Sequence, residues 1–249
     1  MNFDFSEDQK SLRDEARRFL ADKAGPASTR RVLDAPDVSF DQQLWRAMAD
    51  MGWIGVAIPE SYGGTGLGRL EACVLAEEIG RAVAPVPYSS TVYFFAEAVM
   101  LAGGDAQKQA LLPGVAGGGV IGCFALSEGP GAPAPENVQA KFDGGALTGV
   151  KLPVADGDCA THAIIAAREG PGISLFIVDL DQPGVKRTTL KTLDPSRGHA
   201  KLEFNKAKAE RLGDAGQGWD LAEAVLDRAA VLLAFEQVGG SQACLEMAV

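Results

Sequence analysis

The side chains best placed for chemistry in this sequence are Ser127 and Glu128, which stand where an apolar segment breaks into a loop. Residues 124–135 read FALSEGPGAPAP, with three prolines and two glycines in the last seven positions. A hydroxyl and a carboxylate at a strand end can contact a ligand, since loops often carry functional groups. The same residues can also simply terminate a strand, and these residues alone leave both interpretations open.

Other reactive side chains are few and scattered. The two histidines, His162 and His199, have no acidic or thiol cluster near them in the sequence. The four cysteines contain no CxxC pair. They are Cys73, Cys123, Cys159 and Cys244. This spacing favours reduced, structural thiols and predicts neither a metal site nor a disulfide framework.

The composition is that of an ordinary soluble globular protein. Of the 249 residues, 47% are hydrophobic and 22% are charged. A net charge of −10 argues against binding to nucleic acid or to an anionic membrane. The polar N-terminus resembles neither a signal peptide nor a transit peptide, and the most apolar window, residues 92–102, is too short to span a bilayer. We therefore expect a cytoplasmic protein.

The first half of the chain has helical periodicity. Ser6 and Gln9 have capping-box spacing, and Ser39 and Gln42 repeat it. A glycine-rich stretch at residues 52–68 is expected to form a shaped loop that either covers the core or contacts a ligand. The expected helices end at or near Pro26, Gly52, Pro85, Gly103 and Pro113.

After residue 119 the apolar period changes from helical to alternating, which predicts strands. The expected strands are 120–126, 138–142, 146–150, 163–167, 173–179 and 201–204. Frequent turn signals favour an antiparallel barrel or sandwich. No GxGxxG follows a strand and no βαβ alternation is present, so a Rossmann nucleotide site is disfavoured.

From Trp219 the pattern is helical again, with apolar residues on most faces. This helix runs to Val249 without a glycine stop or a polar tail. The pattern suggests that the chain was cut here, or that another chain supplies the missing neighbours.

Short motifs that occur in order along nearly the whole chain resemble the acyl-CoA dehydrogenase family. Residues 59–66, PESYGGTG, are similar to that family's PEeyGG.G loop, and residues 77–81, EEIGR, to its EElGr helix. Residues 124–128, FALSE, resemble its yALTE strand end. Residues 147–151, LTGVK, and 174–178, SLFIV, resemble LnGtK and slFlV. Each motif is weak alone, whereas their shared order is specific.

The resemblance implies an α+β multi-domain fold. It has an N-terminal all-α domain (1–117), a middle antiparallel β-barrel or sandwich (118–213) and the start of a C-terminal helical bundle (214–249), most of which is lacking. It implies FAD and the α,β-desaturation of an acyl-CoA thioester, in which a glutamate removes the α-proton while hydride leaves for flavin N5. Residues 194–197 and 234–240 resemble bacterial members that act on bulky or sterol-derived acyl chains.

The same resemblance implies partners and a cellular role. An electron-transfer flavoprotein would accept the electrons, and the assembly would be a homo- or hetero-tetramer. The implied role is in fatty-acid or steroid catabolism. Neither nucleic acid nor a membrane is an expected partner.

The resemblance places the flavin contacts on two segments. The first is a strand end whose hydroxyl is kept, and it comprises Phe124, Ala125, Leu126 and Ser127. The second has lost the family's stacking aromatic and its hydroxyl, and it comprises Pro153, Val154 and Ala155. Weaker flavin binding is the expected consequence.

Two further positions are expected near the substrate. The family's loop serine falls on Pro133, which lacks both a hydroxyl and an N–H. Arg197 is expected either to meet a CoA phosphate or to pair with Asp194. The catalytic glutamate of one subset falls on Ala229, so no catalytic residue is assigned.

These departures leave two alternatives to a desaturating subunit. One is a non-catalytic partner subunit of a heteromeric enzyme that holds little or no FAD. The other is an acyl-CoA oxidase or a flavin monooxygenase on the same scaffold.

Overall fold

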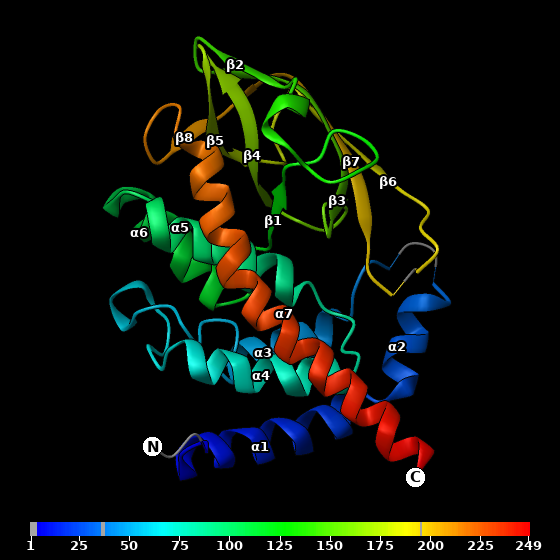
Figure 1. The fold of residues 1–249 in the computed structure, drawn as a ribbon. Helices are drawn as coiled ribbons and strands as arrows, with labels where there is room; N and C mark the ends of the chain where they lie inside the picture. The colour runs from blue at the N-terminus through cyan, green and yellow to red at the C-terminus, as the bar shows by residue number, and fades with distance from the viewer. Residues whose placement is uncertain (1–3, 36–37, 195) are drawn as a thin grey trace.

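The computed structural model describes residues 4–35, 38–194 and 196–249 of the chain. Helices occupy the first part, strands of one sheet follow, and a single long helix closes the chain (Figure 1). This order confirms the fold class expected from the sequence. Among the described residues, no helix has both the length and the apolarity needed to cross a bilayer.

The first N-terminal helix begins where the sequence predicts. Ser6 caps the first helix through a complete capping box, and its hydroxyl accepts the Gln9 N–H at 3.2 Å. The first helix ends before Pro26, and Pro26 itself begins a second helix. Proline is tolerated there because the N–H groups of the first helical turn have no partner within the helix. The α-helices are α1 (Glu7–Lys23), α2 (Pro26–Leu33), α3 (Gln42–Asp50), α4 (Arg69–Arg81), α5 (Glu97–Ala102) and α6 (Asp105–Ala116).

The predicted cap at Ser39 is wrong, because Asp41 caps α3 instead. The Asp41 Oδ1 atom accepts the backbone N–H groups of Gln43 and Leu44 at 3.1 and 3.0 Å. Its other oxygen accepts from Ser28 at 2.6 Å and from Arg31 at 2.9 Å. A carboxylate held in this way suits the positive end of a helix better than a serine two residues earlier.

Two other helix predictions need correction. The helix expected from residue 92 starts earlier, as the π-helix η2 (Ser89–Ala96), and continues as α5. The last N-terminal helix, α6, runs past the predicted stop at Pro113 to Ala116. A proline near the end of a helix removes one N–H bond and leaves the other bonds of that turn intact.

The strands form one eight-stranded sheet in the order β6-β7-β3-β2-β4-β5-β8, with β1 paired to β4. Most neighbouring pairs are antiparallel, as expected, whereas β4 is parallel to both β1 and β2, which the sequence did not predict. The strands are β1 (Gly122–Ala125), β2 (Lys141–Asp143), β3 (Ala146–Ala155), β4 (His162–Glu169), β5 (Gly172–Asp179), β6 (Val185–Thr189), β7 (His199–Lys208) and β8 (Glu210–Leu212).

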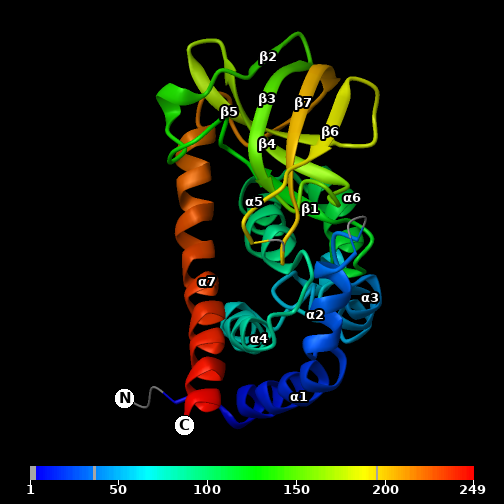
Figure 2. The same cartoon turned by 90° about the vertical axis from the view of Figure 1, so that its right-hand side faces the viewer.

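The last helix, α7 (Gly218–Ala248), connects the two halves of the molecule. It starts beside the sheet and runs down past α4 (Figure 2). Its backbone touches α4 at two glycines: a Cβ on Gly80 would lie 2.0 Å from the Glu236 carbonyl oxygen, and one on Gly239 would lie 1.8 Å from that of Glu77. The close approach of the α7 backbone to the α4 backbone therefore requires glycine at both positions.

Candidate functional site

The structure brings the two expected flavin segments together. The Leu152 N–H donates to the Ser127 carbonyl at 3.0 Å, and Glu128 and Leu152 form an isolated parallel bridge. The end of β1 and the middle of β3 therefore lie side by side. This is the contact on which the expected site depends.

A buried ion pair supports this contact. The Lys151 side chain is fully buried, and its ammonium donates to the Leu126 carbonyl at 3.1 Å and to Glu128 Oε1 at 2.7 Å. Glu128 also accepts the backbone N–H groups of Gln139 and Ala140 at 2.8 and 3.1 Å. Burial lowers the pKa of Lys151, which Glu128 opposes. Glu128 is thus a structural partner of Lys151 and of the backbone at residues 139–140.

The first expected flavin segment ends in a half-buried serine. Ala125 and Leu126 are buried in the core, whereas Ser127 is half-buried. The Phe124 ring stacks on Phe94 of η2, with ring centroids 6.0 Å apart and planes 21° apart. Phe124 therefore supports the strand end from the helical side.

The second segment presents an apolar surface. Pro153 is exposed and follows a cis peptide bond from Leu152, Val154 is fully buried, and Ala155 is half-buried. The proline ring offers a face on which a flat ring can lie, and Ala155 offers no hydroxyl. The residues present thus fit the flavin of this family through the backbone, Ser127 and the Pro153 ring, with fewer polar contacts than the family motif provides.

The structure does not link Pro133 to either segment. It is exposed in the loop between β1 and the short 3-10 helix η3 (Pro135–Asn137), and it has no polar group beyond its carbonyl.

The expected pairing of Arg197 with Asp194 is wrong. Arg197 Nη2 donates to Asp156 Oδ2 at 2.5 Å and to Ser90 Oγ at 3.3 Å. Asp194 instead accepts the Ser196 N–H at 2.9 Å, and hydrogen bonds from Ser196 lower the pKa of Asp194. Arg197 is drawn inward because Asp156, one residue after Ala155, is a buried carboxylate that needs a cation.

This arginine belongs to a buried polar cluster that sequence reasoning missed. The cluster comprises Ser90, Tyr93, Asp156, Arg197 and Glu236. Its members come from η2, from the end of β3, from the segment before β7 and from α7. The only sequence signal was the polar Ser-Ser-Thr run inside an apolar helix, since buried polar residues need partners.

The position of the family's helix-borne base carries no acid. Ala229 is fully buried on the inner face of α7, and Asp227 is exposed. Glu236 points to the polar cluster, and burial raises its pKa. Among the described residues, no group of three or more His, Cys, Asp or Glu could hold a metal ion.

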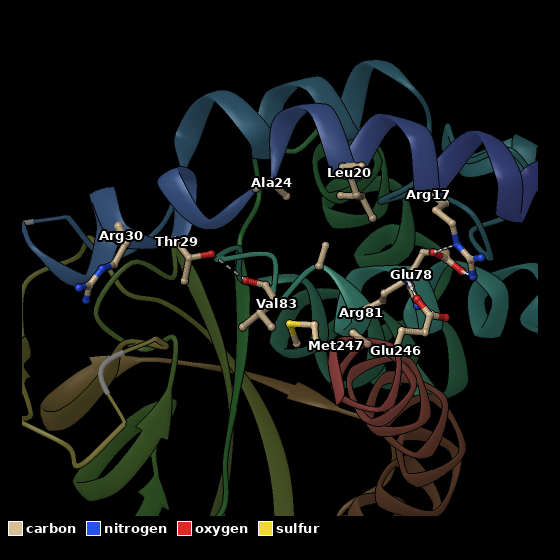
Figure 3. Close-up of a pocket in the computed structure, with 14 residues that line it drawn as sticks. Arg17, Leu20, Ala24, Thr29, Arg30, Glu78, Arg81, Val83, Glu246 and Met247 are labelled. Atoms are coloured by element: carbon tan, nitrogen blue, oxygen red, sulfur yellow. Dashed lines mark hydrogen bonds and ion pairs between the residues drawn. The ribbon is translucent and has the colours of Figure 1, made fainter. Parts of the chain in front are cut away.

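A separate pocket of about 860 Å³ lies between α1, α4 and the end of α7 (Figure 3). Two ion pairs border it, Arg17 with Glu78 and Arg81 with Glu246. None of the predicted site residues lines this pocket. It therefore lies apart from the chemistry expected of the chain.

Comparison with known proteins identifies the family. Residues 6–119 match the family described as "Acyl-CoA dehydrogenase, N-terminal domain". An acyl-CoA dehydrogenase of Bacillus subtilis is 30% identical over 260 residues, which cover 98% of this chain and 68% of that protein. The chain therefore belongs to the acyl-CoA dehydrogenase family, as its motifs predicted.

Two other proteins are similar over much of the chain. The acyl-CoA dehydrogenase FadE27 of Mycobacterium tuberculosis is 34% identical over 193 residues, or 77% of this chain and 51% of that protein. The solved Tcur3481-Tcur3483 steroid ACAD is 34% identical with a TM-score of 0.85, and covers 97% of this chain and 65% of that one. The chain spans about half to two thirds of the length of several curated relatives.

Proposed function

We propose that this chain is a subunit, or part of one, of an FAD-dependent acyl-CoA dehydrogenase that desaturates an acyl-CoA thioester between its α- and β-carbons. The observation that carries the proposal is the pairing of Ser127 with Leu152, which joins the two flavin segments at 3.0 Å. Family membership supports the reaction class. The division into three domains at about residues 117 and 213 belongs to the same proposal.

The residues of this chain would position and shield the reactants. The Ser127 hydroxyl and the backbone at the end of β1 would hold one edge of the flavin ring, and Pro153 would support its face. The buried side chains of Leu126 and Val154 would keep water from this side, which strengthens hydrogen bonds in the site. FAD, when bound, would supply the hydride acceptor. We assign no residue of α7 as the general base, because Ala229 occupies the family position.

The substrate and partners are proposed from the resemblance. Similarity to a steroid ACAD supports a bulky, sterol-derived acyl group. An electron-transfer flavoprotein is the proposed electron acceptor, and a tetramer the proposed assembly.

The visible spectrum of the purified full-length protein tests the proposal. We expect flavin bands and the desaturation of an acyl-CoA with a ferrocenium acceptor, without peroxide release. Peroxide formation would favour an oxidase instead. A flavin-containing protein that desaturates no acyl-CoA would contradict the proposed reaction.

A non-catalytic partner subunit is the second candidate, and Pro153, Ala155 and Ala229 favour it because each lacks the functional group of the family motif. It predicts a colourless protein that supports activity only together with a second chain. Substituting Ala155→Thr restores a hydroxyl, and should then raise the amount of flavin retained on gel filtration. Ala155→Ser adds a hydroxyl at the same position and should also raise the amount of flavin retained.

A further inference from the structure

The buried polar cluster lies directly behind the second flavin segment. Asp156 follows Ala155 in the chain, so the cluster begins one residue beyond the proposed flavin contact. The nearest part of the cluster is satisfied: Ser90 Oγ and Arg197 Nη2 both donate to Asp156 Oδ2. Asp156 is only 4% exposed, and Arg197 offsets its charge.

The part of the cluster farther from Ala155 contains polar atoms without hydrogen-bond partners among the described residues. Tyr93 Oη, Arg197 Nε and Glu236 Oε2 are buried, and none of them has a hydrogen-bond partner among the described residues. Tyr93 is 0% exposed. More than nine in ten buried polar groups in native proteins are paired, so three such atoms in one cluster call for a physical explanation.

The three groups lie near one another. Burial, followed by the charge of Glu236, holds the pKa of Tyr93 well above its ordinary value. Burial raises the pKa of Glu236, which the charge of Arg197 opposes. Each group thus lies within electrostatic reach of the other two, and Tyr93 and Glu236 interact most closely, although none of the three named atoms has a hydrogen bond of normal length to a described residue. Two carboxylates and one guanidinium meet here, together with the Tyr93 hydroxyl.

We propose that Tyr93 Oη, Arg197 Nε and Glu236 Oε2 form a binding site for one hydroxyl oxygen on the acyl part of a ligand. Such an oxygen accepts hydrogen bonds from Arg197 Nε–H and from the Tyr93 hydroxyl, and it donates its own proton to Glu236. A methyl group at the same place satisfies none of these atoms. The inference rests on the proposed function, because it takes the ligand to be an acyl thioester.

Two of the three side chains extend toward the surface of the protein. The Arg197 side chain is 33% exposed and Glu236 is half-buried, so both side chains reach the surface while the named atoms stay sealed. The site begins one residue beyond Ala155, the proposed flavin contact. The hydroxyl would therefore belong to the part of the acyl group beyond the reacting carbons.

Binding of two matched ligand series tests the site. Isothermal titration calorimetry on the full-length protein compares straight-chain acyl-CoA ligands that end in a methyl group with those of equal length that end in a hydroxyl. We expect the hydroxylated ligand to bind roughly tenfold more tightly at the length that reaches the cluster. Tyr93→Phe and Glu236→Gln should each reduce this preference.

Tyr88→Phe is the matched control. Tyr88 is also buried, and its ring lies 5.6 Å from that of Tyr93, but its hydroxyl already donates to the Trp53 carbonyl at 2.9 Å. This variant should keep the preference for the hydroxylated ligand. If both series bind equally at every length, the proposed hydroxyl site is overturned, while the proposed function stands. If neither series binds, both proposals are overturned. A preference that survives Tyr93→Phe and Glu236→Gln also overturns the site.

Discussion

At the residue scale, buried polar side chains differ in whether they have a hydrogen-bond partner. Tyr88 and Tyr93 are neighbours with nearly perpendicular rings, at 83°, and both are almost completely buried. Of these two hydroxyls, only that of Tyr88 has a hydrogen bond of normal length to a described residue. The same side chain in the same part of the core therefore contributes differently to stability at these two positions.

The two tyrosines give a direct stability test. Tyr88→Phe should lower the free energy of unfolding by about 1 kcal/mol, because it leaves the Trp53 carbonyl without its donor. Tyr93→Phe should cost less than this, or nothing, since it removes a hydroxyl that forms no hydrogen bond of normal length with the described residues. Urea denaturation of the two variants and the parent protein measures the difference. A larger loss for Tyr93→Phe would contradict the assignment of partners.

At the element scale, the crossing of α4 and α7 determines how the last helix lies on the rest of the molecule. Gly80 and Gly239 allow the two backbones to meet, and no side chain fits at either contact. Arg81 of α4 and Glu246 of α7 then form an ion pair closer to the C-terminus. The first contact is steric and the second is electrostatic, so each makes a different prediction.

Adjacent glycines of α7 test the steric contact. Gly239→Ala should destabilise the protein by about 1–3 kcal/mol, because its Cβ would lie 1.8 Å from the Glu77 carbonyl oxygen. Gly240→Ala should be neutral, or stabilising by up to about 1 kcal/mol, since its nearest neighbour is 3.5 Å away and alanine favours helix. Thermal melting followed by circular dichroism compares the pair. Equal losses in both variants would show that α7 does not approach α4 as described.

The ion pair predicts a pH dependence. Hydrogen bonds from Arg81 and Gln242 lower the pKa of Glu246 from 4.5 to about 2. A carboxyl whose pKa is lower in the folded state stabilises it above the unfolded pKa, and this stabilisation disappears as the pH falls towards the folded pKa. The difference in urea midpoint between the parent protein and Glu246→Gln should therefore be constant above pH 4.5 and shrink between pH 4.5 and 2.

Glu7→Gln, on the exposed first turn of α1, is the control for general charge effects at low pH. A difference for Glu246→Gln that persists unchanged at pH 2 would exclude the Arg81 pair as its cause.

At the scale of the whole molecule, one buried carboxylate joins three helices that are far apart in sequence. Glu97 of α5 is 5% exposed and accepts hydrogen bonds from Arg69 of α4 at 2.5 Å and from Arg228 of α7 at 2.6 Å. These contacts join the N-terminal helices α4 and α5 to the last helix, α7. They make the packing of the last helix depend on the N-terminal helices.

Loss of the Glu97 charge should lower the stability of the folded protein. Glu97→Gln should lower stability by about 1–2 kcal/mol, less than for a fully buried pair, because both arginines are more than a third exposed and can turn to water. Thermal melting should show the shift, while Glu223→Gln on the outer face of α7 should change the melting temperature less. Equal shifts would mean that Glu97 has no special connecting role.

The sequence by itself determined the order of elements and the family. Those features depend on local periodicity, on turn residues and on short motifs, which are all properties of neighbouring positions. Local signals also misplaced the cap of α3, because the competing Asp41 is stabilised by Ser28 and Arg31 from another helix.

The tertiary structure alone decided which distant polar groups meet. Asp156, Arg197 and Glu236 lie on three different elements, and no spacing along the chain relates them. Arg197 pairs with Asp156 and not with nearby Asp194, because a buried carboxylate gains more from a cation than an exposed one does. The packing of η2 and α7 against the sheet is what removes these groups from water, and so creates the site that the sequence did not predict.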